Sequence, residues 1–139
     1  NEDVLVTALD EGIAPESFDE CQARYEQSGG TGNLRDYFEL DQGRLALAPQ
    51  LRNRISWAQY NLVTDASFNE FELIVCRRAL ADFGPVLRSR VLRLFHDSLS
   101  RFGVLCTDRA FDASEPLGAS FYASPSHYGC YKRAAQAQA

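Results

Sequence analysis

Apolar and polar positions along the chain fall into short runs, and the densest apolar run covers residues 71–76. Short runs with β-branched residues are typical of buried strands, and this one is too short for a buried helix. Two arginines follow it, and apolar residues then recur at helical spacing over 85–102. The pattern predicts a buried strand, a loop and a helix, which together form half of a parallel α/β unit. In such sheets ligands collect beyond the carboxyl ends of the strands, which is where Arg77 and Arg78 stand.

The rest of the pattern predicts one more long helix and several short elements. Ala14, Phe18, Cys21 and Tyr25 fall on one stripe and predict a helix that Pro15 opens. The other expected elements of this half are a strand at 4–8, a helical turn at 34–40, a hairpin turn at 41–43, and strands at 44–47 and 55–60. After the 85–102 helix and its cap, Gly103, we expect a strand at 104–107, an antiparallel pair at 119–123 and 128–133, and a disordered tail at 134–139.

Two features leave an alternative open. The glycine-rich loop at residues 28–33 could hold a phosphate, but phosphate loops follow a strand and open a helix, whereas this one follows a helix. A flexible connector is therefore the favoured interpretation. The arginines of the 85–102 helix could form a nucleic-acid face, although a solvated helix flank is favoured.

Composition narrows the function classes. A chain of 139 residues fits one domain with a real core, and its net charge of −5 argues against a nucleic-acid partner. No apolar run is long enough for a membrane helix, so no membrane insertion is expected. Four cysteines without close spacing and only two histidines predict no metal site. Cys76 and Cys106 lie in apolar runs, as reduced core thiols do, which favours a cytoplasmic location.

Five sequence blocks then point to a family. In chain order they are RDYF, GRLALAPQLRNRISWAQYNLV, FNEFELIVCRRALADFGP, LSRFGVLCTD and YGCYKR. Together they resemble the catalytic domain of the CheR family, which are chemotaxis receptor methyltransferases that use S-adenosylmethionine to methylate protein glutamate side chains. The resemblance implies an α/β fold with a Rossmann-like methyltransferase sheet, helices on both faces and a C-terminal antiparallel hairpin. It also implies a small inserted antiparallel β-subdomain at residues 35–49.

The resemblance assigns cofactor contacts residue by residue. Asn61 and Leu62 match the pair that contacts the adenine region of the cofactor. Cys76 and Arg77 match the first two positions of a Cys-Arg-Asn motif that ends the fourth core strand, whereas Arg78 stands where the family has its Asn.

Two more positions depart from the family. Ala8 stands where an Asp bonds the ribose hydroxyls, and Asp10 lies two residues too late to replace it without a local shift. Asp82 stands where a Tyr lies near the methyl-transfer site. No residue is assigned as a catalytic acid or base, because a substrate carboxylate is already the nucleophile and positioning carries most of the catalysis.

The family's first core strand, its glycine-rich motif and its helical amino-terminal domain have no counterpart in these 139 residues, which contain no Met. We therefore expect a truncated methyltransferase-like domain over 1–133, in which unpaired strand edges could be completed by a second chain or a dimer. The implied function is part of a methyltransferase that acts on a chemoreceptor-like protein, with the chain alone inactive. The alternative is a degenerate, non-catalytic relative that acts as a protein-interaction module in chemotaxis-like signalling.

Overall fold

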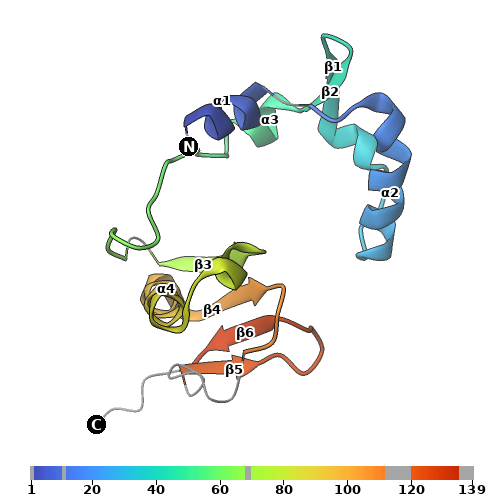
Figure 1. Ribbon diagram of the computed structural model, residues 1–139. Helices are drawn as coiled ribbons and strands as arrows, with labels where there is room; N and C mark the ends of the chain where they lie inside the picture. The colour runs from blue at the N-terminus through green and yellow to red at the C-terminus, as the bar shows by residue number, and fades with distance from the viewer. Residues whose placement is uncertain (1, 11, 68–69, 112–119, 135–139) are drawn as a thin grey trace. The chain divides into compact units, whose positions relative to one another are not determined.

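The computed structural model describes residues 2–10, 12–67, 70–111 and 120–134, and the chain divides into two compact units (Figure 1). The first unit is Asn1–Gln59 and the second is Tyr60–Ala139. Each unit buries side chains of its own, so each is described by itself. The expected single domain over 1–133 stays a prediction.

The first unit combines short helices with a two-stranded antiparallel sheet. Its elements are α1 (Glu2–Asp10), η1 (Pro15–Ser17), α2 (Phe18–Gln27), η2 (Leu34–Tyr37), β1 (Phe38–Asp41), β2 (Arg44–Leu47) and α3 (Pro49–Arg52). The β1–β2 turn consists of Gln42 and Gly43, whose φ angles are 44° and 79°. Two positive φ angles in a two-residue turn match the twist of the flanking strands. The predicted helix after Pro15, the hairpin turn and the 44–47 strand are confirmed.

Leu45 on β2 is the most buried side chain of the first unit, with Phe18 and Ala48 also buried. Its backbone exchanges two hydrogen bonds with that of Ile13, at 2.8 and 2.9 Å between nitrogen and oxygen. The rings of Phe18 and Phe38 meet edge to face with their centroids 5.6 Å apart. These contacts tie η1 and α2 to the hairpin.

Two predicted strands of the first unit are wrong. Residues 4–8 lie in α1, where the Thr7 hydroxyl donates a hydrogen bond to the Asp3 carbonyl one turn earlier, at 2.8 Å. The β-branched residues there prefer strands only weakly, and the valines of this segment are exposed on the helix. Residues 55–60 form no strand with the described residues, and Ile55 instead closes the turn after α3 by donating its N–H to the Arg52 carbonyl. The helical turn predicted at 34–40 ends at Tyr37, where β1 begins.

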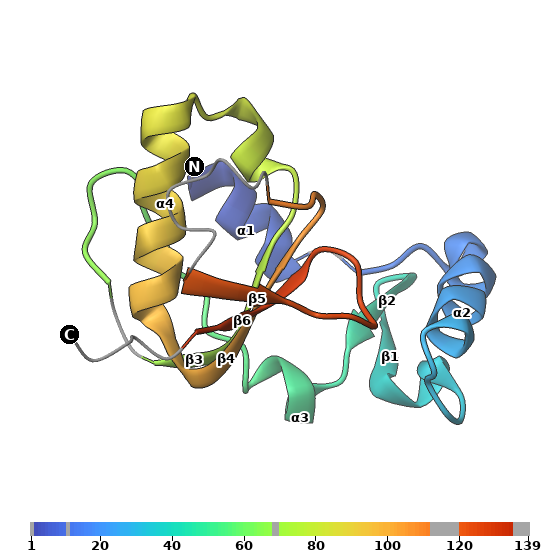
Figure 2. The same cartoon turned by 90° about the horizontal axis from the view of Figure 1, so that it is seen from below.

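The second unit is a mixed sheet with one long helix. Its elements are β3 (Phe71–Cys76), η3 (Ala79–Asp82), α4 (Pro85–Ser98), β4 (Leu99–Thr107), β5 (Phe121–Ala123) and β6 (Cys130–Arg133). The strand order is β3-β4-β6-β5 (Figure 1), with β3 and β4 parallel and the other pairs antiparallel. Figure 2 views the same strands from below, with α4 to one side of them. The predicted parallel strand-helix-strand unit and the closing hairpin are confirmed, although Ala119 lies outside the described residues.

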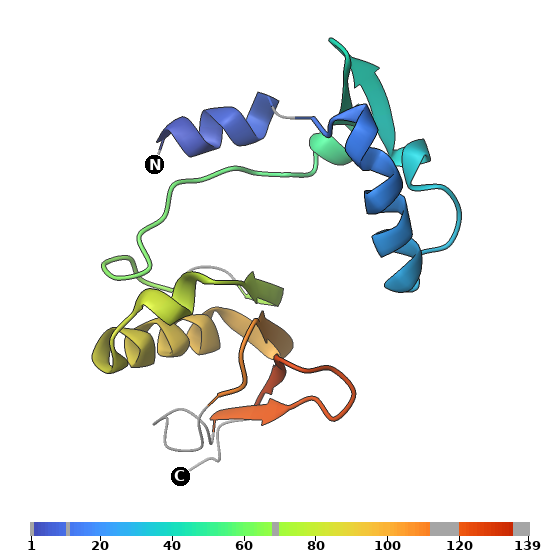
Figure 3. The same ribbon diagram turned by 45° about the vertical axis from the view of Figure 1, so that its right-hand side comes forward.

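One face of this sheet carries the core, and α4 lies along it (Figure 3). Val91, Leu92 and Phe95 of α4 pack in one buried cluster with residues of the sheet. The sheet and loop members of that cluster are Cys76, Leu80, Leu99, Leu105, Phe121 and Tyr131. His96 is buried as well, with its ring edge to face with Phe121 at 5.5 Å between centroids, so its role is structural.

The strand predicted at 71–76 is present as β3, but the prediction that it is buried holds for one face only. Leu73 and Val75 are 57% and 60% exposed, on the face opposite the α4 core. Among the described residues β4 is the one strand that pairs with β3, so β3 forms an edge of the sheet. β3 therefore has the apolar sequence that is typical of an interior strand, although it lies at the edge of the sheet.

The end of α4 also differs from the prediction. The helix ends at Ser98, and Gly103 lies inside β4 instead of capping the helix. A Cβ added to Gly103 would come within 2.9 Å of the Phe71 carbonyl oxygen, so the glycine permits close approach of β3 and β4. At the other end of the chain, Ala134 is buried and donates its N–H to the Ser120 carbonyl. Ala134 therefore does not belong to a disordered tail, and residues 135–139 lie outside the described residues.

Candidate functional site

The strands β3 and β4 end together, because Cys76 pairs with Thr107 in the parallel register. Arg77 and Arg78 therefore leave the sheet at the same edge as Asp108, which follows Thr107. Both arginines are exposed. This shared carboxyl edge is where parallel sheets place their ligands, and it is the candidate site of the second unit. We call it the β3–β4 edge.

Asp108 is the residue of this edge that sequence reasoning missed. Its pKa lies below the usual range, first because its carboxylate accepts a hydrogen bond from the Arg78 backbone, and also because Arg109 and Arg77 are nearby. The carboxylate therefore stays ionised between positive side chains. The signal that could have identified it is an acid directly after the predicted 104–107 strand.

Arg78 adopts a backbone conformation that its residue type disfavours. Its φ and ψ are 67° and −21°, in the left-handed region, and it precedes η3. Asn enters that region far more readily than Arg does. The Asn of the family motif at this position therefore suits the backbone seen here, and Arg78 occupies it with strain.

Cys76 ends β3 on the core side of the sheet and is buried. Burial raises the pKa of its thiol, with a further rise from Asp108. The predicted reduced core thiol is confirmed for Cys76. Cys106, for which the same was predicted, is half-buried.

Asn61 and Leu62 lie in a turn of the second unit. The Asn61 backbone N–H donates to the Asp65 carboxylate at 2.8 Å, and the Asn61 side-chain oxygen accepts from the Val63 N–H at 2.9 Å. Leu62 is half-buried against the cluster that contains Cys76. The local hydrogen bonds fix this turn, and the core contact of Leu62 attaches it to the sheet.

Ala8 and Asp82, the two other predicted positions, both lie in helical elements. Ala8 lies on α1 in the first unit and not at the end of a strand, so the correspondence with the family's ribose acid lacks the strand on which it was based. Asp82 is exposed on η3.

No group of three or more metal-binding side chains occurs among the residues that the structure describes. Nor do the described helices include one long and apolar enough to cross a membrane.

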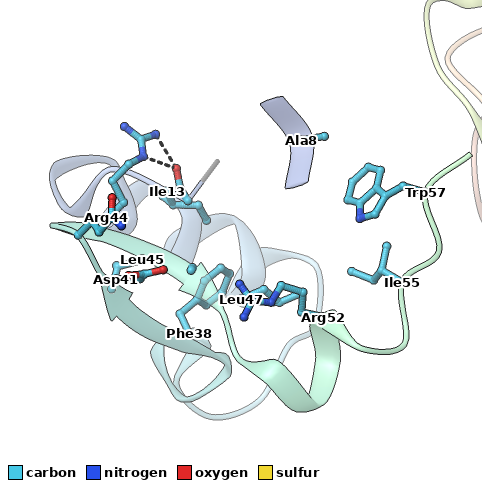
Figure 4. Close-up of a pocket in the computed structure, with 13 residues that line it drawn as sticks. Ala8, Ile13, Phe38, Asp41, Arg44, Leu45, Leu47, Arg52, Ile55 and Trp57 are labelled. Atoms are coloured by element: carbon cyan, nitrogen blue, oxygen red, sulfur yellow. Dashed lines mark hydrogen bonds between the residues drawn. The ribbon is translucent and has the colours of Figure 1, made fainter. Parts of the chain in front are cut away.

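The first unit contains a cavity of about 650 Å³ (Figure 4). Its walls include the hairpin, the Ala8 end of α1 and the segment after α3. Ile55 and Trp57 lie next to each other on one side of it. The Arg44 guanidinium is tied down by two hydrogen bonds to the Gly12 carbonyl, at 3.0 and 2.5 Å. Arg52 lines the cavity and is exposed, so the cavity combines an aromatic wall with a cation.

An α/β sheet with exposed charged residues at the carboxyl edge of its parallel strands is typical of the general class of cofactor-binding domains. Comparison with known proteins identifies the family. The family described as CheR methyltransferase, SAM binding domain, matches residues 25–110. The chain belongs to the CheR methyltransferase family, and the cofactor of this domain is S-adenosylmethionine. The match includes Asn61, Leu62, Arg77 and Arg78, whereas Ala8 lies outside it.

Individual relatives agree with this family. The protein named Cher3 of Pseudomonas putida is 33% identical over 90 residues, which cover 65% of this chain and 33% of that protein. A chemotaxis protein methyltransferase of Listeria innocua is 31% identical over 104 residues, 74% of this chain and 40% of that protein. The chemotaxis protein methyltransferase Cher2 of P. putida is 31% identical over 97 residues, 68% of this chain and 32% of that protein. The chain thus spans about a third to two fifths of the length of these three relatives.

The side chains of the β3–β4 edge fit part of the cofactor. The exposed Arg77 guanidinium suits a carboxylate, and the half-buried Leu62 offers an apolar surface for an adenine ring. Ribose hydroxyls call for acceptors, and two nearby acids already accept from the backbone, Asp65 from Asn61 and Asp108 from Arg78. The described residues therefore suit the carboxylate and adenine ends of the cofactor better than its ribose.

Proposed function

We propose that this chain supplies part of the cofactor site of an enzyme that methylates glutamate side chains of a chemoreceptor-like protein. The observation that carries the proposal is the family match over 25–110, which includes the β3–β4 edge and the Asn61–Leu62 turn. When bound, S-adenosylmethionine supplies a methyl group on a positively charged sulfur. A glutamate carboxylate is already a nucleophile, so the protein's task is to hold the two together and exclude water.

Arg77 has the clearest role in this proposal. It is exposed, lies at the carboxyl end of β3 and matches the family motif, so we assign it to the carboxylate of the cofactor. A charge-assisted hydrogen bond of this kind is stronger than a neutral one. Arg78 adds positive charge beside a cofactor that is positive at sulfur, and Asp108 offsets that charge through its ionised carboxylate.

The test is transfer of a labelled methyl group from S-adenosylmethionine to the cytoplasmic part of a chemoreceptor by the full-length protein. Methyl esters of glutamate hydrolyse in alkali, so the proposal predicts label that is released as methanol at high pH. Label that resists alkali would place the methyl group on another side chain. Absence of transfer by a folded protein that still binds the cofactor would contradict the proposed substrate.

The receptor contact is proposed for the first unit. Its cavity pairs the apolar side chains of Ile55 and Trp57 with the exposed cation of Arg52, which suits a peptide segment carrying both apolar and acidic residues. Trp57 is the one tryptophan of the chain, so its fluorescence reports on this cavity alone. A glutamate-containing receptor peptide should change the Trp57 fluorescence of the unsubstituted protein. The change should be as large in Arg54→Ala, because Arg54 does not line the cavity, and smaller in Arg52→Ala. Equal responses in the two variants would remove the cavity from the proposal.

We propose that the enzyme acts in the cytoplasm.

We also propose that the β3 edge is completed by a strand from outside the described residues. The exposed Leu73 and Val75, together with the position of β3 at the edge of the sheet formed by the described strands, support completion of the sheet. Sedimentation of the chain against its Val75→Lys variant separates the sources of the strand. A dimer that dissociates in the variant indicates a second copy, and a monomer in both indicates another segment.

A further inference from the structure

Two cysteines face each other across neighbouring strands of the second unit. Cys106 of β4 and Cys130 of β6 are partners in the antiparallel register, and their sulfur atoms lie 2.7 Å apart. Both are free thiols, as are Cys21 and Cys76. The pair plays no part in the proposed methyl transfer.

The backbone hydrogen bonds around Cys106 and Cys130 show whether they form a hydrogen-bonded or a non-hydrogen-bonded pair of the antiparallel ladder. The Thr107 N–H donates to the Gly129 carbonyl at 2.7 Å, so the neighbouring pair of residues is the hydrogen-bonded one. The Cys130 carbonyl instead accepts from the Ser124 N–H at 2.8 Å, on the other side of β6. Cys106 and Cys130 therefore form a non-hydrogen-bonded pair.

Such pairs have the shorter separation in antiparallel sheets, with Cα atoms about 4.5 Å apart. Disulfides join residues whose Cα atoms are roughly 4.4–6.8 Å apart. The two distances overlap, so a bond between Cys106 and Cys130 needs no displacement of the strands.

The pair is also within reach of small molecules. Its neighbours Leu105 and Tyr131 point into the core, so the two thiols lie on the opposite face of the sheet, which α4 does not cover. Both cysteines are half-buried, whereas Cys76 is buried on the core side.

We propose that Cys106 and Cys130 form a two-electron redox site, in which a peroxide oxidises the dithiol to a cross-strand disulfide. One thiolate attacks a peroxide oxygen, the oxygen–oxygen bond breaks, and water leaves once the departing oxygen is protonated. The sulfenic acid that results is attacked by the second sulfur, which forms the disulfide and releases a second water. Two thiols and one hydrogen peroxide thus give one disulfide and two waters. A small thiol such as glutathione reverses the step by thiol–disulfide exchange.

Either sulfur can donate the hydrogen bond between the two thiols, so either thiol can make the first attack and the other then closes the bond.

Oxidation would fasten the end of β4 to β6. Cys106 lies two residues before Asp108, so the bond forms beside the β3–β4 edge. It also closes a loop between positions 24 residues apart. A loop of this length predicts an unfolding midpoint about 10 °C higher in the oxidised protein.

Peptide mapping tests the proposal directly, because trypsin places each cysteine on its own peptide. Cys21 lies in 1–24, Cys76 in 55–77, Cys106 in 102–109 and Cys130 in 110–132. One equivalent of hydrogen peroxide should lower the count of free thiols from four to two and join peptides 102–109 and 110–132. Four remaining thiols, or a bond that involves Cys21 or Cys76, would overturn the proposal.

Variants keep the result independent of the folding of any one of them. Cys21→Ser should form the same bond as the unsubstituted protein, and Cys106→Ser should form none. Dimedone, which labels sulfenic acid, should mark the remaining cysteine of the pair in Cys106→Ser or in Cys130→Ser. Labelling in neither of these two variants, or a disulfide in neither the unsubstituted protein nor Cys21→Ser, would exclude the site.

Discussion

The backbone of Arg78 donates a hydrogen bond to the carboxylate of Asp108, across the edge where β3 and β4 end together. This contact joins the loop after one parallel strand to the loop after the next. Arg78 has a left-handed backbone conformation at this point, and the hydrogen bond lowers the pKa of Asp108, which has Arg109 and Arg77 nearby. Residues of the β3–β4 edge, where we propose that the cofactor binds, therefore contact one another.

Replacement of Arg78 by Asn should stabilise the protein. Asn tolerates the left-handed region better than Arg and keeps the N–H that Asp108 accepts, so the free energy of unfolding should rise by about 1 kcal/mol. Urea unfolding measures the change. Arg77→Asn is the matched control, since Arg77 does not have a positive φ. A gain in both variants, or in neither, would mean that backbone strain at Arg78 is not the cause.

Replacement of Gly103 by Ala should destabilise the second unit. The added Cβ would lie 2.9 Å from the Phe71 carbonyl oxygen and from a methyl group of Leu99, which forces β3 and β4 apart. Overpacking of this kind costs about 1–3 kcal/mol. At Gly84 an added Cβ meets nothing within 4 Å, so Gly84→Ala should change the free energy of unfolding by less than about 0.5 kcal/mol. Equal effects would contradict the close approach of the two strands.

The α4 core predicts a strong contrast between two apolar residues of one helix. Leu92 is 1% exposed and Val86 is 87% exposed. Leu92→Ala should lower the free energy of unfolding by about 2–5 kcal/mol, because it removes buried methyl groups and leaves a cavity. Val86→Ala should change it by less than about 0.5 kcal/mol. Chemical denaturation of both variants checks the assignment of the buried face.

Stability in reducing buffer should fall at high pH, and Cys106 should account for part of the fall. Its pKa is raised to about 11 in the folded protein, above the usual value for a thiol, so its contribution is complete below about pH 8.5 and is lost as the pH rises to 11. Cys106→Ala should show a shallower decline over this range than Cys21→Ala. Identical pH profiles would show that Cys106 titrates alike in the folded and unfolded chains.

Local patterns predicted the elements whose own residues determine them. The hairpin turn at Gln42 and Gly43, the strand β3 and the amphipathic helix α4 all carry their signals within a few residues. The failures arose where the outcome depends on a partner. Residues 4–8 and 55–60 have strand-like sequences, but neither pairs with a strand in the described part of the first unit. The exposure of β3 likewise depends on what lies beside it, which its own sequence does not encode.

For the candidate site, too, prediction succeeded where the signal is local and failed where it depends on contacts between residues distant in the chain. Arg77 and Arg78 were identified because they follow an evident strand, and their place at the β3–β4 edge agrees with the family match. Asp108 was missed because its importance comes from a contact with the Arg78 backbone, 30 positions earlier in the chain. The pairing of Cys106 with Cys130 was missed for a similar reason, since spacing along the chain does not reveal cross-strand register.

The central claim is that the β3–β4 edge binds S-adenosylmethionine through Arg77. Calorimetric titration of the full-length protein with S-adenosylmethionine, or with its demethylated product, tests this most directly, with residues 1–139 alone titrated as a comparison. We expect micromolar binding to the full-length protein that Arg54→Ala retains and Arg77→Ala weakens about tenfold or more, as for a lost charge-assisted hydrogen bond. Residues 1–139 alone should bind far more weakly. Absence of binding by a folded full-length protein, or equal affinities of the two variants, would contradict the claim.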